Sequence, residues 1–208
     1  PADRWYVQLN NGNNSFNNST EWLNVQYSTH ISESYIRHGG TSVYFSTFDI
    51  NGDGLPDHIM EHNSNDDVWE IQFNNGKSFE NIQTWGSLDG LSGSWKLIEW
   101  SDPGRVTTVD INGDGLLDRV MRNYNDTFGP WLVQLNNGHG FEPTVQWGPI
   151  IHNNDSDKAH IRVGSEPTKV DFFDINGDGL PDRIMLDVSS TPNHWDVQLN
   201  NGPMPDLL

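Results

Sequence analysis

The chain of 208 residues has no cysteine. This absence excludes disulfides, thiolate metal sites and a cysteine nucleophile. A secreted protein without disulfides needs other cross-links, and bound metal ions are one option. No stretch approaches roughly 18 consecutive apolar residues, so the sequence predicts no membrane insertion.

Basic residues are also scarce, with 11 Lys and Arg against 29 Asp and Glu. A protein that binds nucleic acid needs a basic face, and an acidic surface is repelled by anionic membranes. We therefore expect no nucleic-acid partner. The acids are unevenly placed, because nine of the 29 lie in three short loops.

Those loops belong to an internal repeat. The stretch DINGDGLPD begins at Asp49, returns with one change at Asp110 and returns unchanged at Asp174, which gives spacings of 61 and 64 residues. A second motif has the form WxxQxNNG and occurs four times. It begins at Trp5, Trp69, Trp131 and Trp195. A period of this length indicates a repeat architecture.

Each repeat is predicted to contain four short strands. The first leads into the acidic loop, as in residues 43–49, and the second follows the loop, as in residues 58–60. The third is the alternating Trp motif, which ends in Asn-Asn-Gly, a typical hairpin turn. The fourth closes the repeat near a Phe and a second Trp, as at Phe79 and Trp85. Helical periodicity is lacking.

Repeated four-stranded antiparallel units are typical of β-propeller blades. We predict an all-β, β-propeller-type single repeat domain over 1–208, with about three and a quarter repeats. The approximate boundaries are a partial repeat over 1–27, repeat 1 over 28–90, repeat 2 over 91–152, and repeat 3, without its last strand, over 153–208. Propellers usually close with about 4–8 blades. We therefore expect a homo-oligomer or a part of a longer chain.

Alternating carboxylates in a tight turn predict a bound hard cation, because Ca²⁺ takes 6–8 oxygen ligands from carboxylates, amides and backbone carbonyls. Three Ca²⁺ sites are expected, each with four side chains and one leucine carbonyl. The predicted ligands are Asp49, Asn51, Asp53, Leu55 and Asp57; Asp110, Asn112, Asp114, Leu116 and Asp118; and Asp174, Asn176, Asp178, Leu180 and Asp182.

Two alternatives apply to these loops. An EF-hand begins with the same residues but needs Glu at position twelve, where this chain has Met60, Met121 and Met185. Strands rather than helices are also expected on both sides. The other alternative is that Asp, Asn and Gly form turns without an ion.

The acidic loop, in a unit of about sixty residues followed by WxVQLNNG, resembles the FG-GAP/VCBS calcium-binding repeats of integrin-α-type β-propellers. Similar units occur in fungal propeller lectins and in spacer regions of toxin-complex and Rhs-type proteins. The resemblance implies structural calcium between the first two strands of each blade. It does not extend to integrin ligand-binding loops, which have no matching positions here.

No catalytic motif stands out. The segment GLSGS, residues 90–94, lacks the final glycine of a nucleophile elbow, and the chain has no phosphate loop. His58 occupies the position of Arg119 and Arg183 in the other repeats, so we expect it at the surface. We predict no enzymatic activity in this chain.

The repeated tryptophans are expected to pack between blades. Trp95 and Trp100 have no tryptophan at matching positions in the other repeats, which makes them candidates for stacking on a sugar ring or for packing within a longer loop. We expect a secreted or cell-surface binding or scaffold module that recognises glycans or proteins. The alternative is an accessory segment of a larger secreted toxin or polysaccharide-degrading enzyme, with catalysis encoded elsewhere.

Overall fold

A computed structural model of the chain describes residues 3–27, 42–43, 45–61, 68–89, 98–99, 106–122, 128–151, 161, 170–188 and 191–202. All regular structure in these residues is β-strand, so the expected all-β class is confirmed. Among the described residues, no helix is long and apolar enough to cross a bilayer.

The strands fall into four antiparallel sheets. Their bounds are β1 (Asp3–Val7), β2 (Thr20–Val25), β3 (Ser42–Val43), β4 (Phe45–Phe48), β5 (Asp57–Glu61), β6 (Trp69–Gln72), β7 (Gln83–Trp85), β8 (Ile98–Glu99), β9 (Val106–Val109), β10 (Asp118–Arg122), β11 (Trp131–Gln134), β12 (Val145–Trp147), β13 (Val170–Phe173), β14 (Asp182–Asp187) and β15 (His194–Gln198).

The strand order within each sheet follows the order along the chain. The partial repeat forms the hairpin β1–β2, repeat 1 forms β4-β5-β6-β7, and repeat 3 forms β13-β14-β15. Repeat 2 forms β9 to β12, which continue into β8 and β3. The predicted succession of strands in each repeat is confirmed. The boundaries between repeats stay a prediction.

The region before β4 differs from the prediction. Residues 43–49 were expected to form one strand, but β3 ends at Val43 and pairs with β8, in the sheet of repeat 2. The sheet of repeat 2 therefore holds a piece of chain from repeat 1. β8 begins at Ile98, one of three isoleucines, Ile36, Ile98 and Ile161, that recur 12 or 13 residues before each acidic loop; this recurrence favours an additional short strand there.

Side chains alternate between the two faces of each strand, and the apolar ones form one buried core in each complete repeat. In repeat 1 the buried side chains include Ile50, Ile59, Trp69 and Ile71, with Phe141 of the next repeat packed against them. Repeat 2 has the matching cluster around Ile111 and Trp131. Each cluster takes aromatic side chains from the following repeat, so the repeats share their apolar cores.

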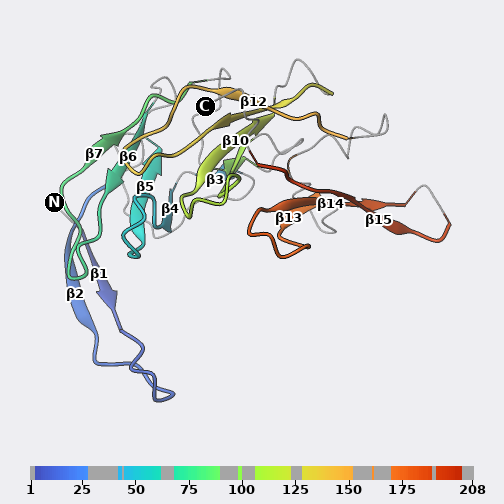
Figure 1. Cartoon of the computed structure of the whole chain (residues 1–208). Helices are drawn as coiled ribbons and strands as arrows, with labels where there is room; N and C mark the ends of the chain where they lie inside the picture. The colour runs from blue at the N-terminus through green and yellow to red at the C-terminus, as the bar shows by residue number, and fades with distance from the viewer. Residues whose placement is uncertain are drawn as a thin grey trace.

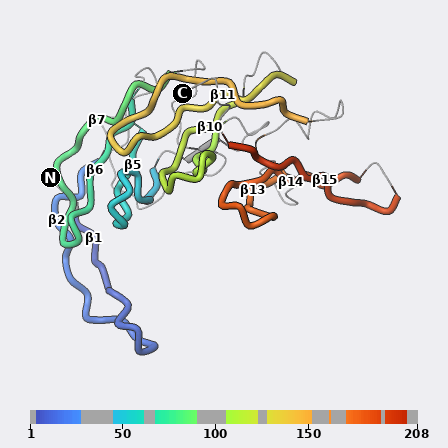
Figure 2. The backbone as a smooth tube through the Cα atoms, in the orientation of Figure 1, coloured from blue at the N-terminus to red at the C-terminus, as the bar shows by residue number. Residues whose placement is uncertain are grey.

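The sheets follow one another along a curved, open array (Figure 1). The hairpin β1–β2 lies at one end and the sheet of β13 to β15 lies at the other. The backbone trace shows the three acidic loops, coloured cyan, yellow-green and orange, on the same side of the array (Figure 2). The three sheets that contain an acidic loop thus present it on the same side of the molecule.

The expectation that His58 is a surface residue is wrong. His58 is fully buried, and its ring contacts Trp5 of the preceding hairpin at 5.0 Å between centroids. Burial lowers the pKa of His58 to about 4, partly offset by its hydrogen bond with Gln72. The second strand lies between two repeats rather than facing solvent, which is why Arg119 and Arg183 are buried as well.

Candidate functional site

Each acidic loop is closed by its first aspartate. In repeat 1 the Asp49 carboxylate accepts hydrogen bonds from the backbone N–H groups of Gly52, Asp53 and Gly54, at 2.8, 3.1 and 2.7 Å. Gly52 and Gly54 have φ values of +79° and +86°, which glycine adopts without steric strain. The turn wraps around Asp49 because these two positions carry no Cβ.

The other two loops repeat this arrangement. Asp110 and Asp174 accept the same three backbone hydrogen bonds in their loops. In repeat 3 these bonds lower the pKa of Asp174, with the bond from Gly179 as the largest cause. The three loops therefore have the same internal construction.

The last aspartate of each loop anchors the loop to the sheet. Asp57 is fully buried, and its two oxygens accept from the backbone N–H groups of Ile50, at 3.3 Å, and Asn74, at 2.9 Å. The pKa of Asp57 is raised to about 6, mainly by burial and to a smaller extent by the nearby Asp53 and Asp49, while its two backbone hydrogen bonds act in the opposite direction. Burial raises the pKa of its counterpart Asp118 to about 7.

The donors in each loop suit a hard cation. They are carboxylate, amide and carbonyl oxygens, and none of the nine loop positions is basic. A buried carboxylate beside two further acids is electrostatically costly, and a divalent cation would offset that cost. The residues present thus fit Ca²⁺ by chemical type.

The side chains are turned onto backbone N–H groups in this structure. Within the described ranges, three ligand atoms of acids or histidines lie within 4.8 Å of one another at Asp187, His194 and Asp196, and not in the acidic loops. The coordination of Ca²⁺ by the fifteen predicted residues stays a prediction. Asp187, His194 and Asp196 carried no repeat signal that could have identified them from the sequence.

Neighbouring acidic loops pack against each other. A Cβ placed on Gly52 would lie 2.8 Å from Leu116 Cδ2 in the next loop, and one on Gly113 would lie 2.9 Å from Leu180 Cδ2. The side chains of two predicted carbonyl ligands, Leu116 and Leu180, therefore cover the loop before them. The third loop has no such neighbour within the described part of the chain, because Gly177 has nothing within 4 Å.

The glutamine of the Trp motif joins consecutive repeats, a role that sequence reasoning missed. Gln72 donates to the backbone carbonyl of Asn24 in the preceding hairpin, at 2.7 Å. Gln134 does the same to Ser87, at 2.9 Å, and Gln198 to Pro149, at 2.5 Å. This glutamine recurs in all four Trp motifs, and that recurrence was the feature of the sequence that could have indicated its role.

The first asparagine of the Asn-Asn-Gly turn makes a second link. The Asn136 side-chain amide donates to the backbone carbonyl of Ile50 in the preceding acidic loop, at 2.7 Å. Asn200 makes the same bond to Ile111, also at 2.7 Å. These asparagines therefore act between repeats as well as within their own turn.

Aromatic rings form the third link, as the packing interpretation of the repeated tryptophans predicts. Phe79 lies edge-on against Trp5 at 5.1 Å, and Phe141 lies edge-on against Trp69 at 5.2 Å. The phenylalanine after each turn thus packs on the Trp of the repeat before it. These contacts confirm that Trp5 and Trp69 pack between repeats.

A cavity of about 280 Å³ opens between repeats 2 and 3. Trp131, Trp147 and Phe172 supply aromatic surface, and Arg183 and Gln198 supply polar groups. The Arg183 guanidinium lies 5.1 Å from the Trp131 ring centroid, and burial lowers the pKa of Arg183 to about 10. Aromatic faces beside hydrogen-bonding groups are typical of sites for small polar ligands. The two tryptophans proposed for sugar stacking, Trp95 and Trp100, lie outside the described residues.

Fold and loops together define a class: a series of antiparallel β-sheet repeats, each with one acidic loop. No family model matches the chain. A curated T-cell immunomodulatory protein homolog of Plasmodium falciparum is 28% identical over 155 residues, which is 70% of this chain and 19% of that protein.

Two solved structures share the fold. The pore of the Photorhabdus luminescens Tc holotoxin has a TM-score of 0.59 at 16% identity, covering 97% of this chain and 8% of that one. The second is the structure of a lectin from Agrocybe aegerita that describes its specific recognition of non-reducing terminal N-acetylglucosamine. It has a TM-score of 0.55 at 25% identity, and the match covers 95% of this chain and 44% of the lectin chain. The chain thus spans less than half the length of each of these three proteins.

Proposed function

We propose that this chain is a non-catalytic, calcium-stabilised β-propeller-type module that binds glycans. The cavity between repeats 2 and 3 carries the proposal. The half-buried Trp147 ring can stack on the apolar face of a sugar, while the Gln198 amide can hydrogen-bond its hydroxyls. The cavity volume of about 280 Å³ suits a ligand of one or two rings.

The similarity to a lectin that recognises terminal N-acetylglucosamine supports this proposal and suggests the first sugar to test. The calcium part of the proposal is supported by the oxygen donors of the three acidic loops. In that role the ions stabilise the fold by mass action and do not contact the ligand. A secreted or cell-surface location follows from both parts, since extracellular modules bind Ca²⁺ at about 10⁻⁴–10⁻³ M.

A glycan array followed by calorimetric titration with N-acetylglucosamine tests glycan binding. We expect binding by the wild type and a loss of at least about tenfold in affinity for Trp147→Ala, because Trp147 lines the cavity. The control is Trp22→Ala, which removes the half-buried Trp at the same position of the partial repeat. Thermal unfolding of both variants checks that they fold. A wild type that binds no glycan on the array contradicts the proposal.

A second candidate is an accessory segment of a larger toxin. The structural similarity to a Tc holotoxin component, of which this chain covers 8%, favours it. Such a segment would bind other parts of its own assembly rather than sugars. Silence on the glycan array together with binding to a protein array supports this candidate over the first.

A further inference from the structure

The third strand of each repeat has two faces that meet different neighbours. In β6 the Trp69 side chain packs on Phe141 of the next repeat, whereas Gln72 reaches back to Asn24 of the previous one. Successive side chains of a strand point to opposite faces, so this division is general. Every repeat therefore has a forward face, built around the Trp, and a backward face, built around the Gln and Asn.

The forward face of repeat 3 is open. Trp195 is 65% exposed, whereas its counterparts Trp69 and Trp131 are 0% and 2% exposed. Ile175, in the third acidic loop, is 43% exposed, whereas Ile50 and Ile111 are buried. Val197 and Leu199 are exposed on the same strand and turn. This forward face carries the apolar groups that the other repeats bury against the next one.

The backward face of the hairpin β1–β2 is open too. Phe16 is 65% exposed, whereas its counterpart Phe79 is 4% exposed and packs on Trp5. Among the described residues, the Asn10 side-chain nitrogen donates no hydrogen bond, and its oxygen accepts from Gly12. The two ends of the described chain are thus the two halves of the contact that joins internal repeats.

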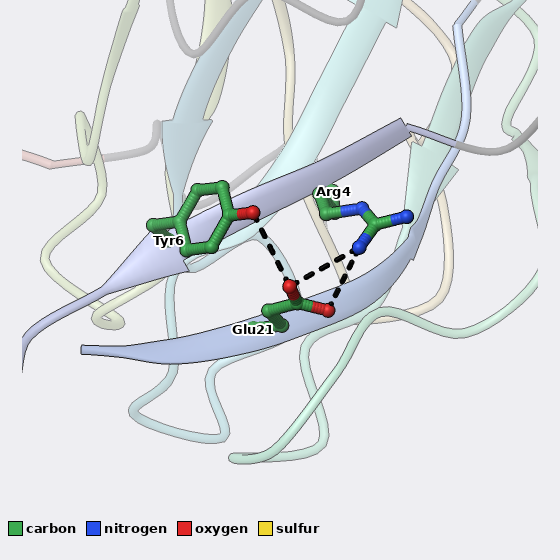
Figure 3. A network of polar contacts seen from close by, with 3 residues as sticks. All are labelled: Arg4, Tyr6 and Glu21. Carbon is green, nitrogen blue, oxygen red and sulfur yellow. Dashed lines mark hydrogen bonds and ion pairs between the residues drawn. The ribbon is translucent and has the colours of Figure 1, made fainter.

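A polar network holds the hairpin in shape. Arg4 Nη1 donates to both carboxylate oxygens of Glu21, at 3.1 and 3.0 Å, and the Tyr6 hydroxyl donates to the same carboxylate at 3.2 Å (Figure 3). These side chains bridge the two strands, and the carboxylate raises the pKa of Arg4. This network therefore holds β1 and β2 together on the backward face of the hairpin. By their positions in the repeat, Phe16 and Asn10 belong to the same face.

We propose that the two open faces bind each other between two copies of this chain, head to tail. Phe16 of one copy packs on Trp195 of the second, and the Asn10 amide donates to the backbone carbonyl of Ile175 in the second. Both contacts are those that Phe141 makes with Trp69 and that Asn136 makes with Ile50 inside the chain. The residues that make these two contacts, Phe16, Asn10, Trp195 and Ile175, do not line the cavity, so the interaction is separable from glycan binding.

This interface is heterologous, so it leads to a ring if the rotation between copies closes and to a linear series otherwise. The hairpin brings the third and fourth strands of a repeat but not the first two. It therefore lacks the buried cation or histidine that Arg183 or His58 supplies next to an internal Trp. Association is expected to be reversible and dependent on concentration.

The test is sedimentation velocity of the 208-residue chain over a wide range of concentrations, with single and mixed variants. The wild type is expected to associate. Phe16→Ala and Trp195→Ala should each weaken association at least about tenfold, and Phe128→Ala, an exposed aromatic in the connection between β10 and β11, should not. Thermal unfolding confirms that each variant is folded.

A mixture of the Phe16→Ala and Trp195→Ala variants tests whether the two copies bind head to tail. Phe16→Ala keeps an intact forward face, and Trp195→Ala keeps an intact backward face, so an equimolar mixture should form dimers and nothing larger. A wild type that stays monomeric throughout, association that survives both substitutions, or a mixture that stays monomeric overturns the proposal. Glycan binding by a strictly monomeric chain would leave the proposed function intact while this inference fails.

Discussion

Repeat 2 and repeat 3 contain nearly the same acidic loop and the same Trp motif, yet their environments differ. In repeat 2 the Trp131 ring packs against Phe172 at 5.3 Å and under the guanidinium of Arg183, both of which come from repeat 3. In repeat 3 the equivalent Trp195 is exposed. Burial of a motif residue is thus a property of the neighbouring repeat, and the same amino acid contributes very differently to stability along the array.

The largest expected difference in the free energy of unfolding is between a variant that lacks a buried tryptophan and a variant that lacks an exposed one. Trp69→Ala should lower the free energy of unfolding by about 3–5 kcal/mol, because it leaves a cavity in a closed core. Trp195→Ala should change it by less than about 0.5 kcal/mol, because an exposed side chain loses little.

Urea unfolding of dilute protein measures both tryptophan variants, with Phe128→Ala as an exposed aromatic control. Equal losses for Trp69→Ala and Trp195→Ala would show that repeat 3 is covered in solution, and would contradict the comparison.

The next largest effect is expected from calcium removal, which tests whether the open acidic loop of repeat 3 binds calcium as the covered loop of repeat 2 does. At calcium about 100 times Kd, one site contributes about 2–3 kcal/mol to folding stability. All the predicted ligands of an ion lie in one loop, so Asp114→Asn in repeat 2 and Asp178→Asn in repeat 3 should reduce this calcium-dependent gain similarly.

The measurement is the melting temperature with calcium and after chelation, and the control is Glu80→Gln, an exposed acid outside the loops. Melting that is unchanged after verified metal removal would remove the calcium sites from the proposal.

The smallest effect concerns two glycines with nearly the same backbone angle. Gly52 and Gly177 have φ values of +79° and +81°, so alanine costs about 1–2 kcal/mol at either position. Gly52→Ala also forces a Cβ to 2.8 Å from Leu116 Cδ2, whereas Gly177 is open. The first substitution should therefore cost about 1 kcal/mol more.

Urea unfolding of the two glycine variants resolves this difference. An equal loss would mean that the contact between neighbouring acidic loops relaxes without cost.

Some contacts could not be predicted from the sequence. His58 stands where the other repeats have arginine, which predicts a surface position, yet it is buried against Trp5. The register that brings residue 58 beside residue 5 depends on how two sheets stack, and no local pattern reports that stacking. For the same reason β3 pairs with β8 rather than extending β4.

The sequence by itself determined the order of the strands around the acidic loops and Trp motifs, the three acidic turns and the all-β class. Those features depend on local periodicity, on turn residues and on the positive φ that glycine permits. Only the tertiary structure decided which repeated residues are buried and which bridge repeats. Gln72 and Asn136 act through partners in the previous repeat, 48 and 86 positions away along the chain. Such contacts exist only after the sheets have stacked, which is why identical motifs are buried inside the array and exposed at its end.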